Sequence, residues 1–167
     1  MDFFNSLLEK KFAAVLAATG AYLATLSFKK RRQSFRRHVG ANTNIIEFQR
    51  STTNMGGRLR FTVNVAVLSA AVAAKNGDDV ERLGASDGHL RQRVGSLMGA
   101  GDKWWTIEAG TNADRLADEV VAALRENVLP YLDRHSSDEA LRRLWESGWS
   151  PGLTTLQRER CLGALCG

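Results

Sequence analysis

The strongest constraint on the fold of this chain is the alternation of apolar and polar side chains between Arg58 and Leu68. Within this segment Phe61, Val63 and Val65 alternate with polar or small residues. Successive side chains of a β-strand point to opposite faces of its sheet, so the pattern predicts a strand with one buried and one hydrated face. We therefore expect a β-sheet at the centre of the fold.

Four other segments have the composition of strands, and the turns beside them contain Gly and Asn. These segments comprise residues 34–39, 43–50, 89–97 and 104–108. Strands this close in sequence usually pair in antiparallel fashion, which predicts a five-stranded meander. Residues 76–88 are rich in Gly, Asp and Ser and lack periodicity, so we expect them to form the longest and least ordered loop.

Helical periodicity is found on both sides of the strands. An N-terminal helix is predicted from Asp2 to Leu26, with Gly20 as a candidate interruption. Further helices are predicted after caps at Asn112 or Thr111, at Ser136 and at Thr154, and Pro130 should end or kink the first of them. The predicted fold is therefore α+β, a two-layer sandwich in which N-terminal and C-terminal helices cover one face of an antiparallel sheet of about five strands.

Length and composition favour one domain over residues 1–167, with a C-terminal helical extension at about 150–167. A chain of 167 residues with 44% hydrophobic residues can bury a core without metal ions or disulfides. The uncharged run from Phe12 to Phe28 is shorter than the roughly 20 residues of a membrane span, so none is predicted. Cys161 and Cys166 lie five residues apart on a predicted helix, which favours reduced thiols and a cytoplasmic protein.

The alternation also predicts which side chains share the hydrated face of the sheet. The inward set is expected to be Phe35, Val39, Ile46, Phe48, Phe61, Val63, Val65, Val94, Trp105 and Ile107. The candidate binding residues on the opposite face are Arg36, His38, Gln49, Arg60, Asn64, Arg91, Arg93 and Trp104. Arg and Trp are frequent interface anchors, and guanidinium groups suit carboxylates and phosphates. The alternatives are an ordinary hydrated surface, or a β-bulge that moves Arg91 and Arg93 to the other face.

The most basic segment, Lys29–His38, adjoins this face. It contains six of the 23 Lys and Arg residues, which stand against 18 Asp and Glu, and so accounts for the whole net charge of +5. Its second half has the pattern of a strand, with Arg36 and His38 pointing outward. We therefore expect one edge of a broad arginine face rather than a disordered basic tail.

No catalytic motif stands out in the sequence. His38, His89 and His135 lack metal-binding spacing, and the short Gly turns lack a P-loop lysine or a dinucleotide-binding pattern. Asp78, Asp79 and Glu81 lie in the predicted loop, where solvated charge explains them better than a magnesium site. We expect no cofactor and no metal, and an enzymatic role has no support from the sequence.

Seven short blocks of the sequence resemble a bacterial family catalogued as domain of unknown function 4304. The blocks are Leu26–Arg31, Ser34–Arg37, Phe48–Ser51, Phe61–Asn64, His89–Gly95, Asp102–Trp105 and Leu129–Leu132, within about residues 12–145. Ser27 stands where such proteins often have Gly. The resemblance implies a fold and no activity, and it suggests that residues of the predicted open face recur in a family.

Three functions remain open at this stage. The first is a non-catalytic binding protein whose arginine-bearing face engages an acidic macromolecular partner, with an immunity-type inhibitor of a bacterial toxin as one form. The second is binding of nucleic acid or an anionic ligand by the same face together with Lys29–Arg32. The third is an unrecognised enzyme.

Overall fold

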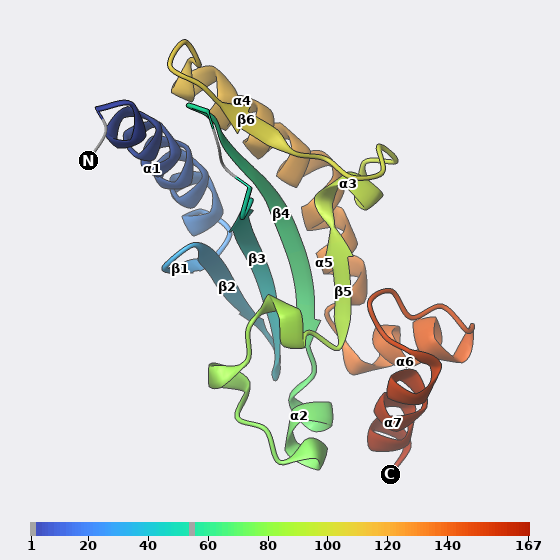
Figure 1. Ribbon diagram of the computed structural model, residues 1–167. Coiled ribbons are helices and arrows are strands. Elements are labelled where there is room, and N and C mark those ends of the chain that lie inside the picture. The colour runs from blue at the N-terminus through green and yellow to red at the C-terminus, as the bar shows by residue number, and fades with distance from the viewer. Residues whose placement is uncertain (1–2, 54–55) are drawn as a thin grey trace.

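The computed structural model describes residues 3–53 and 56–167, and its central element is an antiparallel sheet (Figure 1). The strands are β1 (Lys29–Arg31), β2 (Ser34–Val39), β3 (Asn42–Arg50), β4 (Leu59–Leu68), β5 (Leu90–Arg93) and β6 (Trp105–Ile107). The α-helices are α1 (Phe3–Ala24), α2 (Ala70–Asn76), α3 (Val94–Leu97), α4 (Ala113–Ala123), α5 (Leu129–His135), α6 (Asp138–Glu146) and α7 (Thr155–Cys166). The predicted α+β fold is confirmed.

The pairing of the strands differs from a simple meander. The sheet order is β1-β2-β3-β4-β5, and β6 pairs with β4 along the same edge that β5 uses. The predicted strand 89–97 ends at Arg93 because α3 turns the chain away from the sheet. A Cβ atom on Gly95 in α3 would lie 2.2 Å from the carbonyl oxygen of Gly101, so only glycine allows this backbone approach. The turn after α3 then returns the chain to β4 as β6.

One face of the sheet, the core face, packs against α1, α4 and α5. Phe61 of β4 is at its centre, with ring centroids 5.3 Å from Phe12, 5.7 Å from Phe48 and 5.5 Å from Trp105. The predicted inward residues are buried here, except Val39, which is 37% exposed at the end of the β2–β3 hairpin. The two-layer arrangement therefore follows from the alternation in the strands.

The first helix runs through Gly20 without interruption, because the missing side chain lets α1 approach the ring of Phe35. Asp2, the predicted start of this helix, lies outside the described residues. After α1 the chain turns at Ser27, whose φ of 68° is in the left-handed region. The turn that the family resemblance associates with Gly is thus formed here by Ser.

The C-terminal helices follow the predicted caps with one correction. Asn112 caps α4, and Thr154 and Gln157 form a reciprocal capping box at the start of α7. Ser137, not Ser136, caps α6, because Ser136 is buried and its hydroxyl lies within hydrogen-bond distance of the carbonyl oxygen of Leu132 and of the side-chain oxygen of Asn44. Pro130 does not end the helical path: a π-helical turn at Leu124–Val128 joins α4 to α5.

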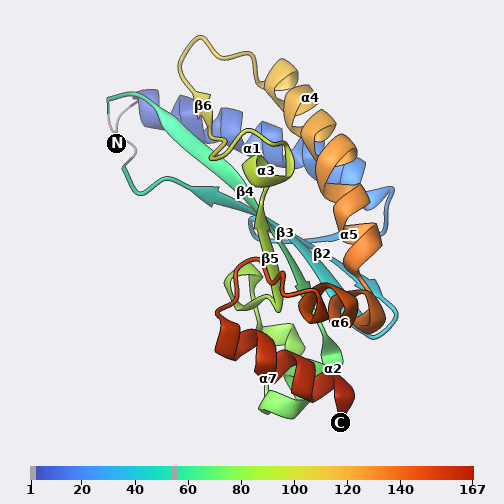
Figure 2. The same cartoon turned by 90° about the vertical axis from the view of Figure 1, so that its right-hand side faces the viewer.

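The largest departure from the sequence prediction is the segment of residues 77–88, which we call the strap. It contains two 3₁₀ turns, Val80–Arg82 and Ala85–Asp87, and lies across the face of the sheet opposite the core. Ala85 packs there against Ile45, Ala66 and Leu68. Figure 2 shows the strap and the helices α4 and α5 on opposite sides of the sheet. The segment expected to be the least ordered loop is thus packed against the sheet.

The C-terminal extension forms α7, which packs against α2 and α6 at one end of the sheet (Figure 2). Gly152, just before α7, lies against Arg91 of β5. Within residues 3–53 and 56–167, no helix combines the length and apolar character that crossing a membrane requires.

Candidate functional site

The cross-strand register shows which of the predicted site residues share the second face, opposite the core. Arg36 pairs with Ile45, Ile45 with Ala66, and Ala66 with Arg91. In the neighbouring row, Glu47 pairs with Asn64, and Asn64 pairs with Arg93. No bulge displaces Arg91 or Arg93 from this register. The strap divides the second face into a covered half, with Arg36, His38 and Arg91, and an uncovered half, with Gln49, Arg60, Asn64, Arg93 and Trp104.

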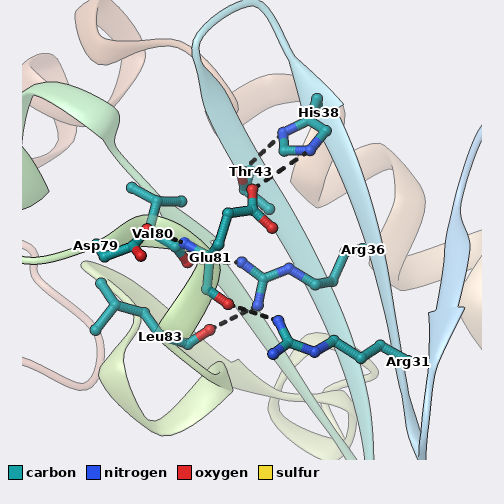
Figure 3. Close-up of polar contacts among 8 residues, drawn as sticks. All are labelled: Arg31, Arg36, His38, Thr43, Asp79, Val80, Glu81 and Leu83. Atoms are coloured by element: carbon teal, nitrogen blue, oxygen red, sulfur yellow. Dashed lines mark hydrogen bonds and ion pairs between the residues drawn. The ribbon is translucent and has the colours of Figure 1, made fainter.

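In the covered half, arginines hold the strap through its backbone carbonyl groups. Arg36 donates from Nη1 to the oxygen of Leu83 (2.6 Å) and from Nη2 to that of Val80 (2.8 Å). Arg31 of β1 donates to the carbonyl oxygen of Glu81 (Figure 3). These bonds satisfy the strap carbonyls that would otherwise face a partly buried surface. Much of the predicted arginine face is therefore engaged within the chain.

Arg91 also donates hydrogen bonds to backbone carbonyl groups, one in the strap and one in the segment before α7. Its Nη1 donates to the carbonyl oxygen of Ser86, 2.9 Å away, and its Nη2 donates to that of Gly152. The backbone N–H of Arg91 also donates to the carbonyl oxygen of Pro151, at 3.2 Å. One side chain thus joins β5 to the strap and to the segment that leads into α7.

Partial burial disfavours the charged form of the Arg36 guanidinium. Desolvation lowers its pKa from the ordinary value, the nearby Glu81 raises it, and the positive charge of Arg31 lowers it. Its Nε is buried and has no hydrogen-bond partner among the described residues. Arg36 remains charged, but its charge is surrounded mainly by carbonyl groups.

His38 lies at the corner of this network. Its Nδ1 is 3.2 Å from the hydroxyl of Thr43, and its Nε2 is 3.7 Å from a carboxylate oxygen of Glu81 (Figure 3). The imidazole and the carboxylate of Glu81 are both exposed, so water weakens the contact between them. His38 is therefore a peripheral contact of the strap.

In the uncovered half, the central feature is the ring of Trp104. The guanidinium carbon atoms of Arg60 and Arg93 lie 5.4 Å and 5.8 Å from its centroid. Asp102 accepts hydrogen bonds from Arg93 (2.9 Å) and from the indole Nε1 of Trp104 (2.8 Å). These two bonds, that of Trp104 being the stronger influence, lower the pKa of Asp102 below its ordinary value. We call Arg60, Arg93, Asp102 and Trp104 the tryptophan cluster.

A hollow of about 630 Å³ lies beside the tryptophan cluster. Asn64 donates to Gln49 across its floor at 2.7 Å, and Ser86 and Gly152 form part of the opposite wall. Glu47 also lines the hollow, and its carboxylate makes no hydrogen bond or ion pair with another described residue. The uncovered half thus adjoins a polar hollow, which the carboxylate of Glu47 and the guanidinium-bearing residue Arg93 both line.

His89 is the most deeply buried histidine of the described residues, and its role is structural. Its Nδ1 accepts a hydrogen bond from the backbone N–H of Ser69 at 2.9 Å. Burial lowers the pKa of His89, against the opposing charges of Asp78, Asp138 and Asp87. The described part of the chain brings no three His, Cys, Asp or Glu residues together in a metal-binding arrangement.

Sequence reasoning missed the strap and the contacts of Asp102. It also did not show that the carboxylate of Glu47 has no hydrogen-bond or ion-pair partner among the described residues. A signal for the strap was present: Ile45–Ile46 and Val67–Leu68 are apolar pairs, which predict burial on both faces of the strands at that level. Asp102 lies two residues before Trp104, within reach of its indole, but its contact with Arg93 depends on the turn after α3. That contact had no signal in the sequence.

The fold and the second face define a two-layer α+β protein in which a strap divides the second face of the sheet. The chain belongs to the family described as domain of unknown function DUF4304, whose model matches residues 19–134. The match covers the six strands, the strap and the tryptophan cluster, whereas α6 and α7 lie outside it. No curated protein and no solved structure matches the chain.

Proposed function

We propose that this protein is a non-catalytic binding protein whose uncovered half engages an acidic protein partner. The observation that carries the proposal is the tryptophan cluster, in which a half-buried indole ring lies beside two guanidinium groups, next to a hollow that Arg93 lines. Trp and Arg are the residue types that most often dominate binding energy at protein interfaces. An acidic partner suits the cluster because guanidinium groups bind carboxylates in bidentate geometry.

The cluster is also preorganised for binding. Asp102 holds the indole and the guanidinium of Arg93 in one arrangement, through bonds of 2.8 Å and 2.9 Å. Side chains that are already ordered lose less conformational entropy when a partner binds. The proposed interface therefore has an ordered centre, with Gln49 and Asn64 as hydrogen-bonding groups beside it. A toxin domain that this protein inhibits is one partner of this class.

The test is co-purification of the full chain with its partner from the native host, followed by affinity measurement. The variant Arg60→Glu with Arg93→Glu reverses two charges of the cluster and should weaken a stoichiometric complex at least about thirtyfold, since losing a desolvated charge pair costs ~2 kcal/mol or more. The matched control, Arg115→Glu with Arg125→Glu, makes the same charge change on the helical side of the molecule. Equal affinities of the two variants would refute the proposal.

A second candidate, nucleic-acid binding, is favoured by the exposed basic strand β1. Phosphate contacts from Lys29, Lys30 and Arg31 should make DNA or RNA affinity fall steeply with salt. A mobility-shift titration at several salt concentrations distinguishes the two functions. Tight, steeply salt-dependent binding of DNA or RNA, without a stoichiometric protein partner, would replace the first proposal with the second.

A further inference from the structure

We propose that a second hollow, beside the strap, binds a phosphomonoester group. This hollow has a volume of about 490 Å³ and lies between the β1–β2 turn, β3 and the strap. Four arginine residues line it, Arg31, Arg32, Arg36 and Arg82. We call it the arginine hollow. It is separate from the tryptophan cluster, so the proposal does not depend on the proposed protein partner.

The positive charge of the hollow is hydrogen-bonded without being neutralised. Arg31 and Arg36 donate to backbone carbonyl oxygens of the strap, and a carbonyl group satisfies an N–H donor but carries no net charge. Arg31 lowers the pKa of Arg36, although the attraction of Glu81, which raises it, is the larger of the two charge effects. The hydrogen bonds to the strap therefore do not neutralise the positive charges of Arg31 and Arg36, and a bound anion would do so.

The carboxylates near the hollow neutralise only part of this positive charge. Glu47 is the one acid among the described residues that line it. Asp79 is 3.7 Å from Arg82, and Glu81 is 3.7 Å from His38, so both contacts exceed hydrogen-bond length. Asp79, Glu81 and Arg82 are all exposed, and water screens such pairs. The hollow consequently keeps a surplus of positive charge.

Arg32 supplies an independent observation. It is at the β1–β2 turn with a φ of 58°, a left-handed conformation that side chains other than Gly, Asn and Asp rarely adopt. Its side chain is exposed and makes no hydrogen bond or ion pair with another described residue. Glycine would fit this turn better, and strained residues are concentrated at binding sites. A role of the guanidinium in binding explains why arginine occupies the position.

A phosphomonoester fits this arrangement better than other anions. It carries a charge of about −1.5 to −2 at neutral pH and has three acceptor oxygens that several guanidinium groups can share. A phosphodiester has one charge and two such oxygens. The volume of the hollow exceeds that of a phosphate group, and Gln33, Ser34 and Gly84 border the remaining space. The phosphate can belong to a small molecule or to a phosphorylated protein side chain.

The test is NMR titration of the full chain, observing the arginine Nε–Hε signals. Phenyl phosphate represents a small molecule, and an acetylated, amidated Ala-phosphoserine-Ala peptide represents a protein side chain. We expect saturable shifts of the Arg31, Arg32 and Arg82 signals with at least one of the two. Tighter binding of one probe assigns the source of the phosphate. Binding of dimethyl phosphate with equal affinity would overturn the phosphomonoester proposal.

Variants separate binding from folding. Arg32→Gly combined with Arg82→Gln should weaken binding of the preferred probe at least about tenfold, since each lost charge-assisted bond contributes strongly. Arg32→Gly should not lower the thermal unfolding midpoint, because it removes backbone strain. Ser27→Gly relieves the same kind of strain at φ 68° without removing a charge, and it should leave affinity unchanged.

A second control removes two arginine charges elsewhere, by Arg115→Ala with Arg125→Ala on the helical side. Unchanged affinity in this control, with a loss in the hollow variant, supports a localised site. Equal losses in both variants would show general attraction to a basic protein and would overturn the proposal. Absence of saturable shifts with both phosphomonoesters would overturn it as well.

Discussion

The two halves of the second face contain the same residue types in opposite roles. In the covered half, Arg36 and Arg91 donate to backbone carbonyls of the strap and of the segment before α7. In the uncovered half, Arg60 and Arg93 contact the ring of Trp104, and Arg93 also lines an open hollow. The difference teaches that an arginine on a sheet surface can serve internal packing as readily as binding, so its hydrogen-bond partners must be known before it is counted as part of a binding site.

The comparison predicts that arginines of the two halves differ in their contribution to stability. Arg36→Ala leaves the carbonyls of Val80 and Leu83 without their donors, so the free energy of unfolding should fall by ~2–3 kcal/mol. Arg60→Ala should change it by less than ~1 kcal/mol, as is usual for an exposed residue. Urea unfolding measures both. Hydrogen exchange of residues 77–88 should accelerate in the Arg36 variant alone, and equal effects of the two substitutions would contradict the distinction.

A smaller effect is the contribution of His89 to the pH dependence of the free energy of unfolding. Burial lowers the pKa of His89 in the folded protein, so the unfolded chain takes up a proton first as the pH falls below about 6.5. The stability from neutral His89 is complete above that pH and is lost as the pH falls toward the lowered folded value. In His89→Asn, Oδ1 can replace Nδ1 as acceptor from Ser69 without titrating.

Urea unfolding between about pH 7.5 and 5.5 should therefore show a weaker pH dependence in His89→Asn than in the unmodified protein. The control is His38→Asn, because His38 is exposed and has only a 3.7 Å contact with Glu81. A pH dependence that both substitutions reduce equally would count against the assignment to His89.

The smallest expected effect tests the uncovered half. The indole N–H of Trp104 and the guanidinium of Arg93 lower the pKa of Asp102. Trp104→Phe removes the indole donor, so the pKa of Asp102 should rise toward the ordinary range while the fold is retained. Carboxyl carbon NMR during a pH titration measures it. Trp149→Phe is the control, since Trp149 is exposed and distant in sequence. An unaltered Asp102 titration in Trp104→Phe would show that the indole N–H does not donate to Asp102.

The fold could be predicted from the sequence to the extent that it depends on local periodicity. The alternation around Phe61 and Val63 located the core face, and the caps at Asn112 and Thr154 were identified from their spacing. Ser136 was misassigned as a cap because a buried hydrogen bond to Asn44, 92 positions away, competes with capping. Sequence spacing contains no information on such distant partners.

The candidate site was predictable only as a set of residues on one face. The arginines fall into two groups because residues 77–88 fold back over the sheet and cover Arg36 and Arg91. The polar composition of this segment did not predict that it packs against the sheet. The arginines bind backbone carbonyl groups of the strap. Because every residue has a carbonyl group, such partners cannot be recognised from the sequence. The composition of the strap therefore could not show that it packs against Ile45.

The strand β1 has a further consequence for solubility. It is a short edge strand of three residues, all of them exposed and all Lys or Arg. If two copies of the protein joined along this edge, six cationic side chains would be brought close together, and their repulsion would oppose continuous sheet formation between molecules. Added salt screens this repulsion, so self-association through β1 should be least at low ionic strength. The basic segment thus protects the protein at its open sheet edge.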